Sequence, residues 1–366
     1  MTVLRVAVIG VGDVAQRDYL PEFKRLAGRA EIAVVCGQGP ERVRAVAERY
    51  AVPRWSTDFR SVVAADDVDA VINLTPIPMH HEISLAALRA GRHVYSEKPI
   101  ASSIRQAQEL RAVAGERNLA FVCAPSVMLF PQVRAVSAIV ASGQLGEILA
   151  ARAHAIAGPP PWAGYDSDPT PFFGAQGGPL IDMAVYPLHA LTGLLGPAAS
   201  VSALASRARD GVDVTDGPYR GARVPVMSDD TWQLLVRIGA CLASVEANFS
   251  TAPSPAPECE LRGERGAIAF TLLDVSAPIS LLSGPAADWV EVPVEHERES
   301  GPDHILGIEH LVDCATSGER PVASADHAIH VLEIIEAARR SVAEEKTITM
   351  PRSDWTPTSA AEGIRS

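Results

Sequence analysis

A carboxylate, a phenol and an imidazole stand at helical spacing in one short stretch near the middle of the 366-residue chain. Two glycines precede Pro179, a pattern typical of a loop that ends where a helix begins. If that helix continues, Asp182, Tyr186 and His189 lie on one face of it. Such a set can bind a polyhydroxylated substrate and exchange its protons.

The same stretch also has a purely structural interpretation. Asp182 then favours the helix start, while Tyr186 and His189 pack against neighbouring side chains. Pro187 complicates both interpretations, because a proline inside a helix usually bends or ends it. The elements that position this stretch must therefore be identified from the rest of the chain.

A glycine-rich turn follows the first apolar run. Residues 4–9 are apolar and β-branched, as in a buried parallel strand, and a helical pattern continues to about residue 26. The turn between them reads G-x-G-x-x-A, which in this context lets a pyrophosphate approach the backbone at a helix N-terminus. The pattern predicts a dinucleotide site formed by Gly10, Val11, Gly12, Asp13 and Val14.

Strands and helices then alternate along the first third of the chain. Further strands are expected at 31–36, 70–74, 93–96 and 119–122, with helices at 40–50, 80–90 and 102–117. This alternation predicts a doubly wound parallel sheet, whose ligands bind beyond the carboxyl ends of the strands.

The residues after the second strand bear on the choice of nucleotide. An NAD-specific protein usually carries a carboxylate there, whereas this chain has Gln38 among small residues. Arg42 could bind a 2′-phosphate, although it could equally lie on a solvated helix face. The stretch therefore favours NADP over NAD.

Thr75, Pro76 and His80 follow the third long strand, and Glu97 and Lys98 follow the fourth. A lysine held by a following proline at the carboxyl end of a strand faces the cofactor crevice. The alternative for this lysine is an ordinary position on the surface.

With these motifs, the chain resembles the glucose–fructose oxidoreductase / inositol dehydrogenase / rhizopine catabolism protein family, known as Gfo/Idh/MocA. The matching motifs are Gly10-x-Gly12-x-x-Ala15, Thr75-Pro76 with His80, Glu97-Lys98-Pro99, and Gly177-Gly178 leading to Asp182. The resemblance implies that Thr75, Pro76, His80, Glu97 and Lys98 join Gln38, Arg42 and the glycine-rich turn in binding the cofactor.

The resemblance also implies roles in catalysis. Lys98 would lie beside the nicotinamide and the reacting carbon, and Tyr186 would exchange the proton of the substrate hydroxyl or carbonyl. Asp182 would hydrogen-bond a neighbouring hydroxyl and orient Lys98, and His189 would contact another hydroxyl or serve as a second base.

The activity expected on this basis is an NAD(P)-dependent oxidoreductase. It would transfer a hydride between the nicotinamide and a secondary alcohol or ketone of a sugar, cyclitol or related polyol. The alternative is a glycosidase or lyase of the same fold that uses tightly bound nucleotide for transient oxidation and elimination. A non-catalytic nucleotide sensor has no need of Lys98, Asp182 and Tyr186 together.

From about residue 126 the pattern changes to strands separated by long loops, at 147–155, 201–206, 231–238, 242–249, 258–262 and 267–272. We expect a Rossmann domain over 1–125, an α+β substrate-binding domain with an open, mostly antiparallel sheet over 126–350, and a flexible tail over 351–366. The resemblance implies that another subunit covers one face of that sheet, in a homodimer or homotetramer.

A loop at 158–174, rich in proline and aromatic residues, leads into the Asp182 stretch. Its rings could stack on the apolar faces of a sugar, or the loop could be a stiff cover for the sheet.

The composition limits the range of partners. Acidic residues number 44 against 32 basic ones, a net charge of −12, which argues against nucleic acid or an anionic membrane as the main partner. The five cysteines lie far apart, so their spacing predicts no metal site and is typical of buried thiols in a reducing compartment. With no leader pattern and no apolar run of bilayer length, we expect a cytoplasmic location.

Overall fold

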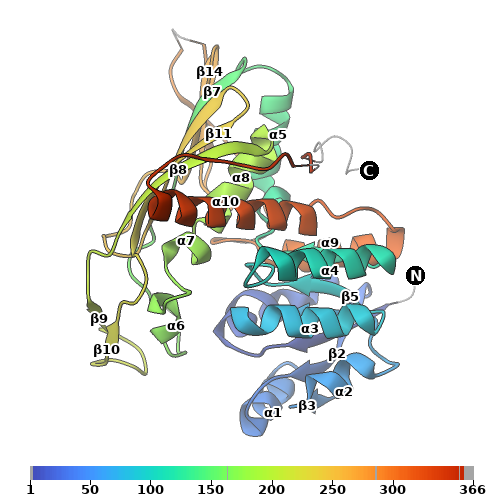
Figure 1. Ribbon diagram of the computed structural model, residues 1–366. Coiled ribbons are helices and arrows are strands. Elements are labelled where there is room, and N and C mark those ends of the chain that lie inside the picture. The colour runs from blue at the N-terminus through green and yellow to red at the C-terminus, as the bar shows by residue number, and fades with distance from the viewer. Residues whose placement is uncertain (1–2, 163, 285–286, 354, 358–366) are drawn as a thin grey trace. The chain divides into compact units, whose positions relative to one another are not determined.

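The computed structural model describes residues 3–162, 164–284, 287–353 and 355–357 (Figure 1). The chain divides into two compact units, residues 1–126 with 304–329 and residues 127–303 with 330–366. Part of the tail expected to be flexible, residues 354 and 358–366, lies outside the described residues. Within the described ranges, no helix combines the length and the apolar character that crossing a membrane requires.

The first unit contains a six-stranded parallel sheet in the order β3-β2-β1-β4-β5-β6 (Figure 1). The strands are β1 (Leu4–Ile9), β2 (Ala30–Cys36), β3 (Trp55–Ser56), β4 (Ala70–Asn73), β5 (His93–Ser96) and β6 (Phe121–Cys123). The chain order reverses between β1 and β4, which is where doubly wound sheets bind ligands. The predicted α/β fold is confirmed.

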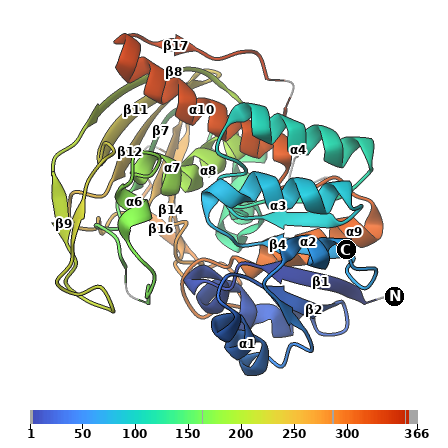
Figure 2. The ribbon, with the colours of Figure 1, turned by 60° about the horizontal axis from the view of Figure 1, so that its bottom comes forward.

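The helices of this unit are η1 (Ala15–Tyr19), η2 (Leu20–Leu26), α1 (Pro40–Arg49), α2 (Phe59–Ala64), α3 (Ile77–Arg89), α4 (Ile104–Glu116) and α9 (Ile305–Ser317). Helices α3 and α4 lie side by side on one face of the sheet, and η2 contacts α9 on the other (Figure 2). The helix after the glycine-rich turn is irregular, a π-helix followed by a 3-10 helix. Pro21 accounts for this, because it has no N–H for the carbonyl four residues earlier.

The second unit is built on a nine-stranded sheet in the order β16-β15-β14-β13-β7-β12-β11-β8-β17 (Figure 1). Strands β7 and β12 pair in parallel, and the other neighbours pair antiparallel. The sheet strands are β7 (Ile148–Ala155), β8 (Ala198–Ser206), β11 (Thr231–Ile238), β12 (Cys241–Asn248), β13 (Cys259–Gly263), β14 (Gly266–Phe270), β15 (Ile279–Ser283), β16 (Val290–Val292) and β17 (Ile348–Thr349). The expected open, mostly antiparallel sheet is confirmed.

The remaining elements of this unit are η3 (Val127–Leu129), α5 (Pro131–Ala141), α6 (Thr170–Phe173), α7 (Pro179–Asp182), α8 (Val185–Leu195) and the hairpin of β9 (Gly211–Asp213) and β10 (Arg223–Pro225). Helix α10 (Ala325–Glu344) starts in the first unit and continues into the second. Helices α5 and α8 pack on one face of the sheet. Along β11, side chains from Trp232 to Ile238 alternate between buried and exposed, so the face of the sheet opposite the core is exposed at this strand.

Candidate functional site

Gly10 lies where the end of β1 meets the end of β4. Its φ is +99°, and an added Cβ would lie 2.5 Å from the backbone carbonyl carbon and oxygen of Leu74. Its N–H donates to the carbonyl of Cys36 at 2.8 Å. Only glycine fits this turn, because any side chain would overlap backbone that cannot move aside.

Gly12 lies two residues further along the same turn and differs from Gly10 in its surroundings. A Cβ added there would meet no atom of the described structure within 4 Å. The packing of the chain therefore does not require this glycine, and the space in front of it is open. This is the geometry that a bound pyrophosphate needs to reach the backbone at a helix N-terminus, so the turn fits a dinucleotide.

Arg42 lies close to the glycine-rich turn. Its guanidinium is 3.5 Å from the carboxylate of Asp13, which is only 10% exposed, whereas Arg42 is half exposed. The structure thus brings together two residues predicted to bind the cofactor, although they lie 29 positions apart. Gln38 is exposed in the loop between β2 and α1.

Asn73, the last residue of β4, positions the Thr75 loop. Its side chain is fully buried, and its Oδ1 accepts hydrogen bonds from the Thr75 hydroxyl at 2.6 Å and the Thr75 N–H at 3.3 Å. Its Nδ2 donates to the carbonyl of His80 at 3.1 Å and to Ser84 at 3.0 Å. Asn73 was not among the predicted site residues, although one polar side chain ending a wholly apolar strand could have indicated it.

His80 connects the loops that follow β4 and β5. Its Nδ1 is 2.7 Å from the carbonyl oxygen of Pro99, and its Nε2 is 2.7 Å from that of Thr75. The ring is almost completely buried, and this burial lowers the pKa of His80. A neutral imidazole donates from one nitrogen only, so the ring hydrogen-bonds one of these two carbonyls and packs against the other.

Lys98 follows the last residue of β5 by two positions and is half-buried. Its N–H donates to Oε2 of Glu97 at 2.8 Å, and the N–H of Glu97 donates to the carbonyl of Asn73 at 2.9 Å. The first unit thus brings the glycine-rich turn, Thr75, Glu97 and Lys98 to the carboxyl edge of one parallel sheet.

In the second unit, helix α7 starts at Pro179 as predicted. Gly178 precedes it with φ +93°, and an added Cβ would lie 2.9 Å from the Ser228 hydroxyl. Gly177 is equally constrained, because its Cβ would lie 2.4 Å from the carbonyl oxygen of Pro171. Both glycines are therefore required by the packing of this loop against its own unit.

The single helix considered for Asp182, Tyr186 and His189 is wrong. Helix α7 ends at Asp182, and α8 begins at Val185. The carbonyl of Pro179 accepts from both Met183 and Ala184, as in a widened turn. The three side chains therefore do not form one continuous helical face.

Pro187 is the physical reason for the break. In a continuous helix its N–H would bond the carbonyl of Met183, and a proline has none. That carbonyl accepts instead from the N–H of Tyr186 at 3.2 Å. Pro187 then lies in the first turn of α8, where a missing N–H costs nothing.

The three candidate side chains of this stretch differ in exposure. Asp182 and Tyr186 are half-buried, whereas His189 is 6% exposed. The Nδ1 of His189 lies 2.7 Å from the carbonyl oxygen of Val185, so this nitrogen is assigned the proton. Burial lowers the pKa of His189 to about 4, and the imidazole is therefore neutral at pH 7.

The aromatic residues of the 158–174 loop pack against one another. Trp162 meets Tyr165, Phe172 and Phe249 edge to face, with ring centroids 5.4–5.8 Å apart. Its indole N–H donates to the carbonyl of Ala157 at 3.0 Å. These contacts form a small aromatic core that braces the loop before α7.

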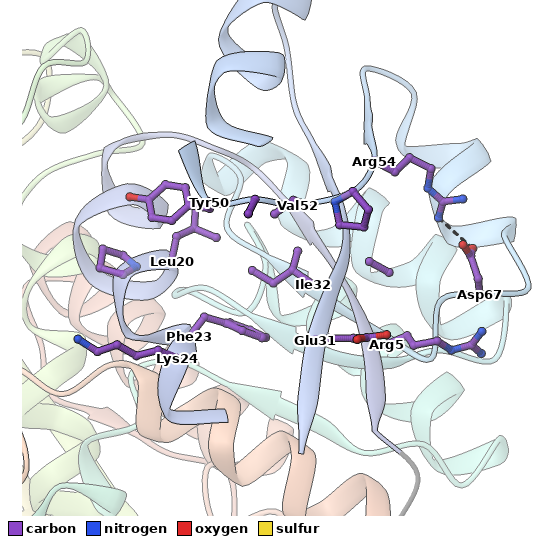
Figure 3. A pocket seen from close by; sticks show the side chains of 14 residues that line it. Arg5, Leu20, Phe23, Lys24, Glu31, Ile32, Tyr50, Val52, Arg54 and Asp67 are labelled. Carbon is purple, nitrogen blue, oxygen red and sulfur yellow. Dashed lines mark hydrogen bonds and ion pairs between the residues drawn. The ribbon is translucent and has the colours of Figure 1, made fainter. Parts of the chain in front are cut away.

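A cavity of about 750 Å³ lies elsewhere on the first unit (Figure 3). Leu20, Phe23, Ile32 and Tyr50 form its apolar part, and it lies at the amino half of β2. Ligands of doubly wound sheets bind at the opposite edge, so this cavity is separate from the dinucleotide site. Among the described residues, no three or more His, Cys, Asp or Glu side chains are grouped to hold a metal.

Comparison with known proteins agrees with this geometry. Residues 4–124 match the model of an oxidoreductase family with an NAD-binding Rossmann fold, and residues 133–269 match the Gfo/Idh/MocA C-terminal domain. The chain therefore belongs to the Gfo/Idh/MocA family of oxidoreductases.

Individual relatives act on sugars. A dTDP-3,4-didehydro-2,6-dideoxy-alpha-D-glucose 3-reductase from Actinomadura kijaniata is 33% identical over 195 residues, which are 53% of this chain and 56% of that protein. The chain thus spans just over half the length of this curated relative.

Two solved structures match over nearly the whole chain. A 3-ketoreductase from Actinomadura kijaniata in complex with NADP and TDP-benzene has a TM-score of 0.75 at 25% identity, covering 93% of this chain and 98% of that one. A levoglucosan dehydrogenase in complex with NADH and levoglucosan has a TM-score of 0.81 at 21% identity, covering 96% and 100%. The first was solved with NADP and the second with NADH.

The two glycines of the turn provide a matched test of the dinucleotide site. Gly10→Ala is expected to lower the free energy of unfolding by roughly 3 kcal/mol, because it combines backbone strain with overlap. Gly12→Ala is expected to change it by less than about 0.5 kcal/mol while weakening nucleotide binding by about tenfold or more. Urea unfolding and fluorescence titration measure the two effects. Equal nucleotide affinity in Gly12→Ala and wild type would contradict the assignment.

Proposed function

We propose that this protein transfers a hydride between a nicotinamide dinucleotide and a secondary alcohol or ketone of a sugar, cyclitol or related polyol. The observation that carries this proposal is the open space at Gly12 on the same sheet edge as Lys98. The open turn suits a dinucleotide, and an ammonium group suits a hydroxyl that must lose or gain a proton. The sugar reductase and dehydrogenase names of the relatives support the substrate class.

A nicotinamide dinucleotide held at the glycine-rich turn would supply or accept the hydride. Tyr186 takes the proton of the substrate hydroxyl during oxidation and returns it to the carbonyl oxygen during reduction. Lys98 binds the same oxygen. Asp182 binds a neighbouring hydroxyl of the substrate.

His189 has a more limited part in this proposal. Because its imidazole is neutral and buried, it accepts or donates a hydrogen bond and carries no charge at pH 7. We propose that it supports a hydroxyl of the substrate at the α8 helix, one turn after Tyr186.

NADP is the proposed nucleotide. The support is the neutral Gln38 in the loop after β2 and the guanidinium of Arg42 beside the glycine-rich turn. Arg42 would bind the 2′-phosphate, and Asp13 would hold the guanidinium in place when the nucleotide is bound.

Titration of the purified protein with NADPH and with NADH tests the cofactor. A denatured aliquot is first checked for released nucleotide. We expect little nucleotide to co-purify with the protein. NADPH should bind more tightly than NADH, and this preference for NADPH should be smaller in Arg42→Ala. Stoichiometric nucleotide that does not exchange would instead favour transient oxidation and elimination by a glycosidase or lyase. Binding of neither nucleotide would overturn the proposal.

Substitutions of the proton-transfer pair test the mechanism. Lys98→Met and Tyr186→Phe are expected to lower turnover of a polyol substrate by roughly two to four orders of magnitude. Melting temperature should stay close to that of wild type in both variants, and nucleotide affinity should stay close to it in Tyr186→Phe. Lys24→Met and Tyr219→Phe are matched controls at exposed positions and should retain full turnover. Near-normal turnover in both active-site variants would contradict the assigned roles.

We also propose that the protein is a homodimer or homotetramer. Leu204, Leu235 and Leu242 are 52–78% exposed and share one face of the nine-stranded sheet through the β8–β11 and β11–β12 registers. Exposed leucines on adjoining strands are typical of a surface that a second subunit covers.

Light scattering tests the assembly. Wild type is expected to have the mass of two or four chains, and Leu235→Glu is expected to dissociate, since the carboxylate would be buried without a partner. Tyr219→Glu, which lies away from this sheet face, should keep the wild-type mass. A single-chain mass for wild type would contradict the proposal.

A further inference from the structure

A phenol on the helix after the glycine-rich turn contacts the loop that carries Lys98. The hydroxyl of Tyr19 donates to Oε1 of Glu97 at 2.6 Å, while Oε2 of the same carboxylate accepts from the N–H of Lys98 at 2.8 Å. Glu97 therefore connects a side chain of η1 to the backbone of Lys98.

The hydrogen bonds run in one direction. A phenol has one proton, and that of Tyr19 is donated to Glu97. The hydroxyl of Tyr95, 2.8 Å from that of Tyr19, must then be the donor in the bond between them. The chain of donors runs from Tyr95 through Tyr19 to the carboxylate of Glu97.

Both phenol rings are held firmly. Tyr19 and Tyr95 are 1% and 0% exposed, and their rings meet edge to face with centroids 5.8 Å apart. The ring of His304 stacks on Tyr19 at 5.9 Å. On α9, a Cβ at Gly307 would lie 2.5 Å from the ring of Tyr95, so the ring of Tyr95 packs closely against the backbone of this helix.

Tyr19 acts as a donor and not as a base. Burial, followed by the charge of Glu97, raises the pKa of Tyr19 well above 10. Its hydroxyl therefore keeps its proton at any pH at which the protein works. A fixed donor of this kind orients a carboxylate and takes no part in the proton exchange itself.

We propose that Tyr19 is a positioning residue, which acts through Glu97 to hold the Lys98 loop in the conformation that places the amine for reaction. This inference rests on the proposed function for the effect of Tyr19 on turnover. The effect of Tyr19 on the Lys98 loop does not depend on any activity. Both effects can be measured.

The lysine content of the chain allows a direct measurement. The sequence contains three lysines, Lys24, Lys98 and Lys346, so mass spectrometry can follow acylation of each amine separately. In Tyr19→Phe, which keeps the ring and loses the hydroxyl, the acylation rate of Lys98 is expected to rise by about fivefold. The rates of Lys24 and Lys346 should stay unchanged.

Tyr50→Phe is the matched control. The hydroxyl of Tyr50 donates to the carbonyl of Gln16 on the same helix as Tyr19 and does not contact Glu97. The same chemical change there should leave the acylation rate of Lys98 and the turnover at wild-type values. If the acylation rate of Lys98 rose in Tyr50→Phe as much as in Tyr19→Phe, the cause would be a general loosening of the helix, and the inference would be overturned.

A double-mutant cycle tests the route through Glu97. If Tyr19 acts through this carboxylate, Tyr19→Phe should have no further effect on Lys98 in a Glu97→Gln background. In Tyr19→Phe alone, kcat should fall by about tenfold while the KM for nucleotide stays within about twofold of wild type. Additive effects in the cycle would overturn the inference.

The outcomes separate this inference from the proposed function. An unchanged acylation rate of Lys98 in Tyr19→Phe overturns the positioning role, even if wild type turns over a polyol. Absence of turnover in wild type, with the acylation rates changed as expected, overturns the function and supports the positioning role.

Discussion

The contact between the β1 turn and the end of β4 is the constraint on which the site of the first unit depends. Gly10 approaches the backbone of Leu74 so closely that no side chain fits between them. This contact aligns the glycine-rich turn with Asn73, which in turn orients the Thr75 loop and accepts the N–H of Glu97 on its backbone. At this point β1 and β4 approach each other with no side chain between them. The residues that follow β1, β4 and β5 therefore lie at the same carboxyl edge of the sheet.

The site is built mainly from backbone groups and buried polar side chains. Asn73 has both polar atoms of its amide hydrogen-bonded to the chain itself and fixes the Thr75 loop, and the neutral ring of His80 donates to one of the two carbonyls, of Thr75 and Pro99, that lie within hydrogen-bond distance. Such groups cost free energy when they are left without hydrogen bonds in the interior. Hydrogen bonds within the chain order the loops after β4 and β5 before any ligand binds. Binding therefore costs less conformational entropy.

Much of the first unit could be predicted from sequence, because parallel strands are short apolar runs and the glycine turn has a fixed spacing. The short β3 and α2 were missed, since they have little apolar periodicity. The break between α7 and α8 follows from Pro187, which has no N–H for the carbonyl of Met183. Whether such a proline breaks a helix depends on whether that carbonyl finds another donor, which here is the N–H of Tyr186. Tyr19 was missed because its role arises from partners brought close by the fold, and no local pattern encodes such a meeting. Asn73 did have a local signal, since it is the one polar residue that ends the apolar strand β4.

The first unit is also discontinuous in sequence. The edge of β6 is completed by a segment 200 residues later, where the N–H of Cys123 donates to the carbonyl of Ala323 and Val122 bridges Ser324. During synthesis on the ribosome, this edge therefore stays without its partner until most of the second unit has been made. An uncovered strand edge is a template for wrong pairing, so the nascent chain passes through a stage at which this edge is exposed to it.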